Sequence, residues 1–296
     1  MTATRVLSAA IVAMLWFAVA PLAKEDPQSR WLTREQRATQ HALRFAGDGQ
    51  HTLEVRTTTG AITIEAYDGN EVDMIVSKVV RGETEEDLRD AEREVELDVA
   101  DNARVVGAVV RQRDQPVCGD EFNNNWPSRG WRRRYDVRYD FMIRVPRNTR
   151  LDLCTINKGD VTVSGTRADF EIRSVNGRIT MTGVGGSGQA TTVNGRVTAT
   201  FAAVPRMPSL FKTINGDIVV SFPERLAADL RLKTFNGGLY TDFETQPVPA
   251  RAVAIPQREN GRFVYRNQYT TVRVGGGGPE LTLDAFNGDV RVLRAR

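Results

Sequence analysis

From about residue 50 onward, apolar and polar residues alternate along most of the chain. Two short alternating runs meet repeatedly at an Asn-Gly step, and the phase of the alternation slips by one residue there. Alternation with a period of two predicts half-buried β-strands. Glycine tolerates the positive φ that a corner or bulge requires. The pattern therefore predicts pairs of strands joined by sharp corners.

Six of these corners share one cassette, which consists of a small residue, an apolar residue, asparagine and glycine. Successive asparagines are separated by 19, 18, 21, 21 and 51 residues. With asparagine as position zero, apolar residues recur at minus six, minus four, plus three and plus five, and position minus two is Thr, Ser or Ala. A spacing near 20 residues is typical of one rung of a solenoid. The cassettes are centred on Asn157, Asn176-Gly177, Asn194-Gly195, Asn215-Gly216, Asn236-Gly237 and Asn287-Gly288.

Two all-β folds fit this pattern. Asn-Gly between alternating runs is a strong hairpin signal, so a series of cassettes could form an antiparallel β-meander. Alternatively, each cassette stacks on the previous one in a β-solenoid or β-helix-like fold. Stacking explains the small residue at minus two, and it lets inward-facing asparagines hydrogen-bond one another as a ladder. We favour the solenoid, in which the cassettes are structural residues.

The rest of the chain is assigned around this repeat. A degenerate rung is expected from Leu53 to Ile64, with Thr59 in the asparagine place. We predict a single β domain over residues 50–296, with insertions near 83–134 and 244–278. Thr84 precedes three acidic residues and predicts the N-cap of a short helix. Residues 24–49 form a polar lead-in, for which we expect helix between Leu32 and Phe45.

The N-terminus has the pattern of an export signal. Arg5 precedes an uncharged apolar run from Val6 to Leu22, and small residues occur at Ala20 and Ala23. This predicts a secretory signal peptide over residues 1–23. An uncleaved signal is the alternative, and it is the only membrane attachment that we expect. The protein is therefore expected in the periplasm or at the cell surface.

Export bears on the two cysteines, Cys118 and Cys154. In an oxidising compartment an even number of cysteines favours a disulfide, although two free thiols are the alternative.

Composition argues against several classes of function. The net charge of +3 is the difference between 40 basic and 37 acidic residues, which is too balanced to predict a nucleic-acid partner. The two histidines, His41 and His51, both precede the main repeat, so a zinc site or a histidine-dependent triad has few potential members. We expect no cofactor.

A column of aspartates follows some of the corners. Asp160, Asp217 and Asp289 occupy similar places in three cassettes, and stacked carboxylates could bind calcium. Arginine or glycine fills this place in the other cassettes, which favours a solvated turn with charge pairing. We therefore expect no metal at this column.

One segment has the composition of a binding surface. Residues 126–135 contain two tryptophans, four arginines and a tyrosine. Trp and Arg are enriched at binding hot spots. The alternative is that the aromatic side chains cap one end of the solenoid while the arginines remain solvated. The candidate partner-binding residues are Trp126, Trp131, Arg132, Arg133, Arg134 and Tyr135, and the partner would be an envelope protein or polysaccharide.

The repeated cassettes, the strand Phe141–Pro146 before them and the signal peptide together resemble the bacterial putative adhesin family. The members of this family are exported envelope proteins that contain a domain of unknown function. The resemblance covers roughly residues 50–296 and implies a β-solenoid-like fold and an envelope location. It defines no binding residues. The aromatic and arginine-rich region up to Tyr139 and the long late insertion depart from the family pattern.

These observations favour a non-enzymatic exported β-solenoid that acts in adhesion or as an envelope scaffold. The alternative is a carbohydrate-active β-helix enzyme that uses carboxylates along one face, such as Asp160 with Asp152 or Asp169.

Overall fold

The structure of the protein is a computed structural model. The structure describes residues 31–35, 38–45, 49–101, 104–113, 117–118, 134–248, 257–259, 262–264 and 269–295, all within one compact unit, Trp31–Arg296. The expected signal peptide lies outside these residues.

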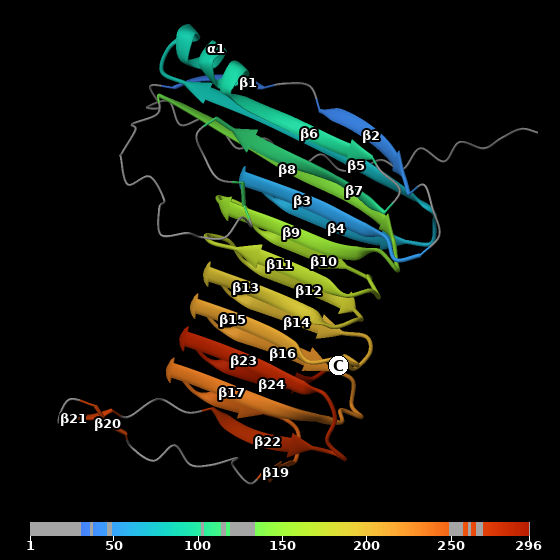
Figure 1. The fold of residues 1–296 in the computed structure, drawn as a ribbon, viewed down its shortest axis with the longest axis vertical. Coiled ribbons are helices and arrows are strands. Elements are labelled where there is room, and N and C mark those ends of the chain that lie inside the picture. Colours follow the sequence, from blue (N-terminus) through green and yellow to red (C-terminus); the bar gives the residue numbers. More distant parts are fainter. Residues whose placement is uncertain are drawn as a thin grey trace, which may run out of the picture. The chain divides into compact units, whose positions relative to one another are not determined.

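The described residues form one helix and a long series of short strands (Figure 1). The helix is α1 (Glu85–Glu94). The strands are β1 (Leu32–Glu35), β2 (Thr39–Arg44), β3 (Thr52–Thr59), β4 (Ile62–Tyr67), β5 (Glu71–Gly82), β6 (Val95–Asp101), β7 (Val105–Gln112), β8 (Tyr135–Pro146), β9 (Arg150–Asn157), β10 (Val161–Ser164), β11 (Phe170–Ser174), β12 (Ile179–Val184), β13 (Gly188–Asn194), β14 (Val197–Phe201), β15 (Ser209–Asn215), β16 (Ile218–Phe222), β17 (Ala228–Asn236), β18 (Leu239–Thr241), β19 (Thr245–Pro247), β20 (Gln257–Glu259), β21 (Arg262–Val264), β22 (Thr270–Val274), β23 (Glu280–Asn287) and β24 (Val290–Arg294).

Most strands belong to two 11-stranded sheets, and each cassette contributes one strand to each sheet. The first sheet, sheet A, runs β1-β5-β8-β4-β10-β12-β14-β16-β24-β18, with β2 also on β5. The second, sheet B, runs β19-β22-β17-β23-β15-β13-β11-β9-β3-β7-β6. Neighbouring cassette strands are parallel within both sheets. The β-solenoid is therefore confirmed and the meander is wrong, because each Asn-Gly corner joins two sheets instead of two paired strands.

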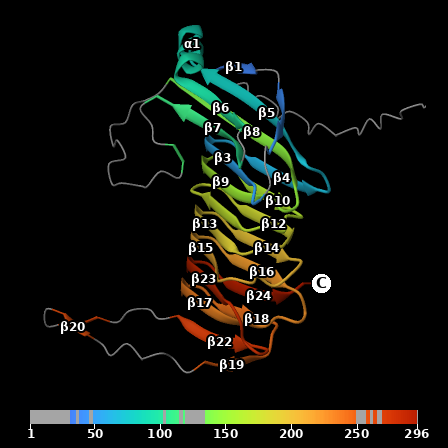
Figure 2. The same ribbon diagram turned by 45° about the vertical axis from the view of Figure 1, so that its right-hand side comes forward.

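The rungs do not stack in the order of the sequence. The last cassette, β23 and β24, lies between β15/β16 and β17/β18, although it follows both in the chain (Figures 1 and 2). Its Asn287 is in register with Asn215 on one side and with Asn236 on the other. The degenerate first rung is confirmed, since Thr59 pairs with Asn157.

Inward-facing side chains from both sheets fill the space between them. The predicted apolar positions are buried on both sides of most corners, as Leu151 and Leu153 in β9 and Val161 and Val163 in β10 illustrate, and Leu239 in the terminal strand β18 is partly buried. Four phenylalanines lie in ring contact within this core: Phe170, Phe201, Phe211 and Phe222. The period-two pattern therefore assigned the core face correctly.

At each corner, glycine and the small residue hold consecutive rungs close together. A Cβ on Gly177 would lie 1.9 Å from the carbonyl oxygen of Gly159, so only glycine fits there. The threonine at minus two donates to a corner carbonyl of the neighbouring rung, as in Thr192 Oγ1 to Gly177 O at 2.9 Å. Equivalent bonds run from Thr155, Thr213 and Thr234.

The asparagine side chains form the expected ladder, but the ladder faces the solvent instead of the core. Nδ2 of each donates to Oδ1 of its neighbour at 2.7–2.9 Å, in the order Asn176–Asn157, Asn194–Asn176, Asn215–Asn194, Asn287–Asn215 and Asn236–Asn287. All five bonds are solvent-exposed, so the prediction that the asparagines face inward is wrong. A primary amide satisfies only part of its hydrogen-bonding capacity in such a ladder, and the solvent can satisfy the rest.

The end of the stack nearest the N-terminus is built from antiparallel strands and the helix. Thr84 caps α1 as predicted, accepting from Asp87 N at 3.1 Å. The helix expected between Leu32 and Phe45 is wrong, because this stretch forms β1 and β2, which pair antiparallel with the 12-residue strand β5. Pairing satisfies backbone groups along that long edge. At the other end, β22 pairs antiparallel with β17, and β19 pairs antiparallel with β22 and forms the edge of sheet B.

Candidate functional site

The outer face of sheet B carries a disulfide. Cys154 lies in β9 and bonds to Cys118, 36 residues earlier, with 5.7 Å between the Cα atoms. The disulfide is therefore confirmed. Both cysteines are buried in a small cluster with Ile156, against which Val175 packs. Such a bond is typical of proteins that leave the reducing cytosol.

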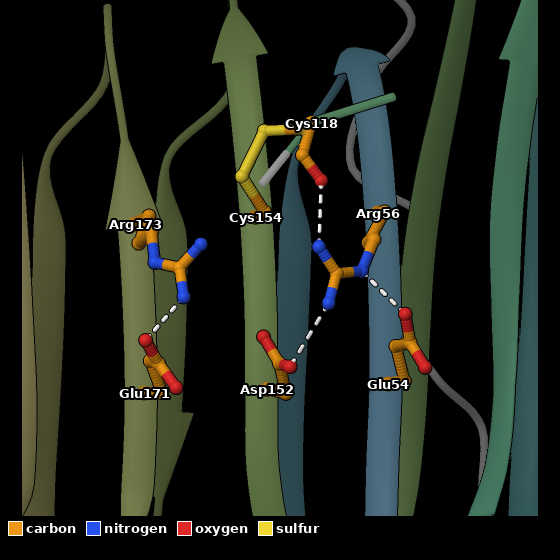
Figure 3. Close-up of polar contacts among 7 residues, drawn as sticks. All are labelled: Glu54, Arg56, Cys118, Asp152, Cys154, Glu171 and Arg173. Carbon is orange, nitrogen blue, oxygen red and sulfur yellow. Dashed lines mark hydrogen bonds and ion pairs between the residues drawn. A yellow bond between two sulfur atoms is a disulfide. The ribbon is translucent and has the colours of Figure 1, made fainter. Parts of the chain in front are cut away.

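Arg56 anchors the chain on the other side of Cys118 (Figure 3). Its guanidinium donates to the Cys118 carbonyl oxygen at 2.9 Å and to Asp152 Oδ2 at 3.0 Å, and it also binds Glu54. Only 17% of its side chain is exposed. The disulfide and Arg56 together hold Cys118 against strands β9 and β3.

Three carboxylates lie side by side on the outer face of sheet B. Glu54, Asp152 and Glu171 are in register on β3, β9 and β11. Burial raises the pKa of Asp152, against the opposing effect of the Arg56 guanidinium, and the nearby Glu171 raises it further. Glu171 is itself ion-paired with Arg173. Each carboxylate thus has a cationic partner, and the row of carboxylates fixes the positions of Arg56 and Arg173.

The carboxylates proposed for an enzyme are occupied by structural hydrogen bonds. Asp160 accepts from the backbone N–H of Arg178 at 2.8 Å, and Asp169 accepts from that of Ser187 at 2.8 Å. Each of these acceptors satisfies a backbone donor on the next rung. Neither contacts Asp152 in the described structure.

The same backbone contact explains the aspartate column. Asp217 accepts from Asp289 N at 3.0 Å, and Asp289 accepts from Gly238 N at 2.9 Å. Donation from Gly238 and Arg291 holds the pKa of Asp289 below its usual value. Across the described ranges, no group of three or more His, Cys, Asp and Glu side chains is arranged to hold a metal ion.

The tryptophan and arginine segment is described only at its end. Trp126, Trp131, Arg132 and Arg133 lie outside the described residues. The ring of Tyr135 packs against the cluster under α1 formed by Val80, Leu88 and Ala91, and its hydroxyl binds Glu94. Arg134 is exposed, and its carbonyl accepts from Glu83 N at 3.1 Å. Tyr135 thus helps to fix the helix.

A different feature of sheet B has the character of a binding surface. Position minus one of every cassette points away from the core, so the stacked rungs form a column of apolar side chains. We call it the outer apolar column, and in spatial order it consists of Ile156, Val175, Val193, Ile214, Phe286 and Phe235.

The outer apolar column is covered at one end and open at the other. Ile156 is buried beneath the disulfide, with 6% exposure. Exposure then rises to 41% at Ile214, 49% at Phe286 and 58% at Phe235. The two phenylalanine rings stack with centroids 4.9 Å apart and planes 4° apart. Contiguous patches of exposed apolar side chains are typical of interaction surfaces.

Basic groups flank the open end. Lys212 and Lys233 point outward from β15 and β17, on either side of Asp284 in β23. Tyr269 donates to Asp284 Oδ2 at 2.7 Å, and burial together with this contact raises the Tyr269 pKa to about 12. The Arg231 guanidinium lies 4.1 Å from the centre of the Tyr269 ring. The open end therefore presents an apolar centre with a mainly cationic border.

Comparisons with known proteins add little to this geometry. No family model matches the chain, and no curated protein matches it. One solved structure is similar, the crystal structure of a putative cell adhesion protein from Clostridium sporogenes ATCC 15579. It has 9% sequence identity and a TM-score of 0.40, over 88% of this chain and 100% of that one. A TM-score of that size does not establish a shared fold. No helix in the described part of the chain is long and apolar enough to cross a membrane.

Proposed function

We propose that this protein is a non-enzymatic, exported binding protein that acts in adhesion or as a scaffold in the periplasm or at the cell surface. The observation that carries the proposal is the open end of the outer apolar column, where Ile214, Phe286 and Phe235 are all more than 40% exposed. These side chains stand on adjacent parallel strands of a fully paired sheet, so a partner would meet a rigid surface.

The chemistry of this surface favours a protein partner over a glycan. Buried aromatic side chains contribute most of the energy at the centre of protein interfaces, and a ring of less critical contacts excludes water around them. The stacked pair can act as such a centre. The lysines at its border, Lys212 and Lys233, favour acidic groups around an apolar patch on the partner.

The experiment compares a double substitution on sheet B with a control substitution on sheet A. The test variant is Phe235→Ser with Phe286→Ser, and the control is Tyr240→Ser. Tyr240 is in the same rung as Phe235 but on sheet A, and its exposure of 52% is close to that of Phe235. Binding of purified protein to immobilised cell-envelope material is measured before and after protease treatment of that material.

We expect the double variant to lose binding and the control to keep it, with protease abolishing binding of the unchanged protein. Equal binding by both variants would overturn this assignment. Binding that survives protease but not glycan oxidation would replace the protein partner by a polysaccharide. Turnover of any glycan that disappears on Asp152→Asn would overturn the non-enzymatic proposal.

A further inference from the structure

The out-of-order rung has two neighbours that could also pair with each other. Thr213, Asn215 and Gly216 of β15/β16 occupy the same cassette positions as Thr234, Asn236 and Gly237 of β17/β18. Asn236 donates to Asn287 at 2.7 Å, and Asn287 donates to Asn215 at 2.8 Å. Without β23, the side chain of Asn236 would face the same acceptor on Asn215. We call the position between β15/β16 and β17/β18 the slot. The same type of contact forms whether β23 and β24 fill the slot or its two neighbours close on each other.

The inserted rung makes a weaker corner than its neighbours. Its residue at minus two is Ala285, which is buried and has no hydroxyl group. Thr213 donates to Gly195 O and Thr234 donates to Gly288 O, both at 2.8 Å. No such donor reaches Gly216 O from Ala285. Residues 280–294 are thus held by backbone pairing, by the asparagine ladder and by the buried side chains of Leu281, Leu283, Val290 and Val292, and a second copy of the chain would supply the same groups.

The connection into this rung has the composition of a hinge. Strand β22 pairs with one edge of β17 and β23 pairs with the other, so residues 275–279 carry the chain around the start of β17. Four of these five residues are glycine. Gly275 and Gly277 have φ of +59° and +74°, a region that favours glycine. A Cβ on Gly278 would lie 2.6 Å from Ala227 O, so the connection lies against backbone without side-chain anchors.

We propose that residues 280–294 form an exchangeable rung, so that the slot between β15 and β17 accepts this segment from a second copy of the chain. In the exchanged dimer each slot contains the same residues as in the single chain, so every contact within the slot is retained. Exchange of an identical element across a short hinge is a low-cost route to dimers. The proposal does not depend on the proposed function of the outer apolar column.

The experiment joins two positions that meet across the slot. Asn215 and Asn287 are in-register neighbours, and adjacent parallel strands place Cα atoms within the range that a disulfide spans. The natural Cys118 and Cys154 are already paired, so new cysteines are the only free thiols. Asn215→Cys and Asn287→Cys are made in two separate full-length chains, which are refolded together and oxidised with oxidised glutathione.

A matched pair controls for chance collisions. Asn194 and Asn215 are both exposed and in register, but the rungs that carry them are consecutive in sequence. Asn194→Cys and Asn215→Cys are mixed and treated identically. A chain carrying both Asn215→Cys and Asn287→Cys verifies that the slot pair can cross-link at all.

We expect a cross-linked dimer from the slot mixture, no such dimer from the control mixture, and an intramolecular bond in the doubly substituted chain. Deletion of Gly276 and Gly277 should increase the proportion of dimer, because a shorter hinge strains the closed monomer. An intramolecular bond in the doubly substituted chain, together with no more dimer from the slot mixture than from the control mixture, would overturn the proposal.

Discussion

Asn236 donates its side-chain amide to Asn287 at 2.7 Å, although 51 residues separate them in the sequence. Asn287 in turn donates to Asn215, which lies 72 residues before it. From Asn236 the ladder therefore runs first to Asn287 in the last cassette and only then to Asn215, although Asn215 belongs to the cassette directly before Asn236 in the sequence. This places Asn287 in the interior of the ladder, with a partner on both sides.

Replacing Asn287 by alanine should destabilise the protein because it removes two ladder bonds at once. Each is solvent-exposed, so we expect a loss of about 1 kcal/mol in total in the free energy of unfolding. Lys212→Ala, a change at an exposed outward position on the neighbouring strand, should stay within about 0.5 kcal/mol. Urea denaturation measures both, and equal midpoints for the two variants would contradict a stabilising ladder.

Gly177→Ala should be far more disruptive than its small change in volume suggests. The added methyl group would lie 1.9 Å from the carbonyl oxygen of Gly159 in the preceding rung, so the stack must separate locally. We expect a loss of about 3 kcal/mol. Gly276→Ala is the matched control, since nothing lies within 4 Å of its Cβ and its φ is not in the left-handed region. Thermal unfolding that places the two variants at the same midpoint would show that the rungs can separate easily.

Removing the disulfide should lower stability without unfolding the stack. Cys118→Ala with Cys154→Ala frees a loop of 36 residues, for which chain entropy gives a loss of roughly 3–4 kcal/mol. Chemical reduction of the disulfide in the unchanged protein should lower its unfolding midpoint by as much as the double substitution does. A reductant should have no effect on the double variant, and any effect there would point to a cause other than this bond.

Acid should weaken the end of the stack where β22 joins β17. Arg273 donates to both oxygens of Asp229, at 2.7 and 2.9 Å, and this contact holds the Asp229 pKa below its usual value. A lowered folded-state pKa means that the stabilisation is present above the unfolded-state pKa of about 3.9. It is lost as the pH falls from there through the folded-state pKa.

The variant Asp229→Asn should therefore lose less stability between pH 5 and pH 2 than the unchanged protein. Glu224→Gln, a change at an exposed carboxylate of the preceding loop, should keep the original acid dependence. Unfolding free energies measured across this pH range test the difference. Parallel curves for Asp229→Asn and the unchanged protein would rule out the contact as a source of acid sensitivity.

Much of the fold could be predicted because the cassette encodes inward and outward positions separately. Period-two alternation identified the core on both sides of each corner, and the match of Thr59 to the asparagine place located the first rung. The spatial order of the rungs could not be predicted. Since the cassettes carry the same contact groups, the sequence alone does not distinguish Asn236 from Asn287 as the neighbour of Asn215.

Other features were missed for identifiable reasons. The sequence of residues 32–45 has no strong apolar period, and β1 and β2 form within this range because the long edge of β5 is available to pair with them. The outer apolar column was visible as an apolar residue at minus one in every cassette. Its meaning depends on the direction in which Phe235 and Phe286 point, and that direction depends on where the phase slip occurs. Tyr269, at the border of this surface, comes from the late insertion and carries no repeat signal.

The place of β23 and β24 has a consequence for biogenesis. A ribosome completes residue 241 well before it reaches residue 280, so both walls of the slot exist before the segment that fills it. A chain that folded step by step as it was made would close β15 against β17 and shut out its own last cassette. Folding that begins only once residue 294 is available would avoid that error, because the segment that fills the slot is then present together with both of its walls.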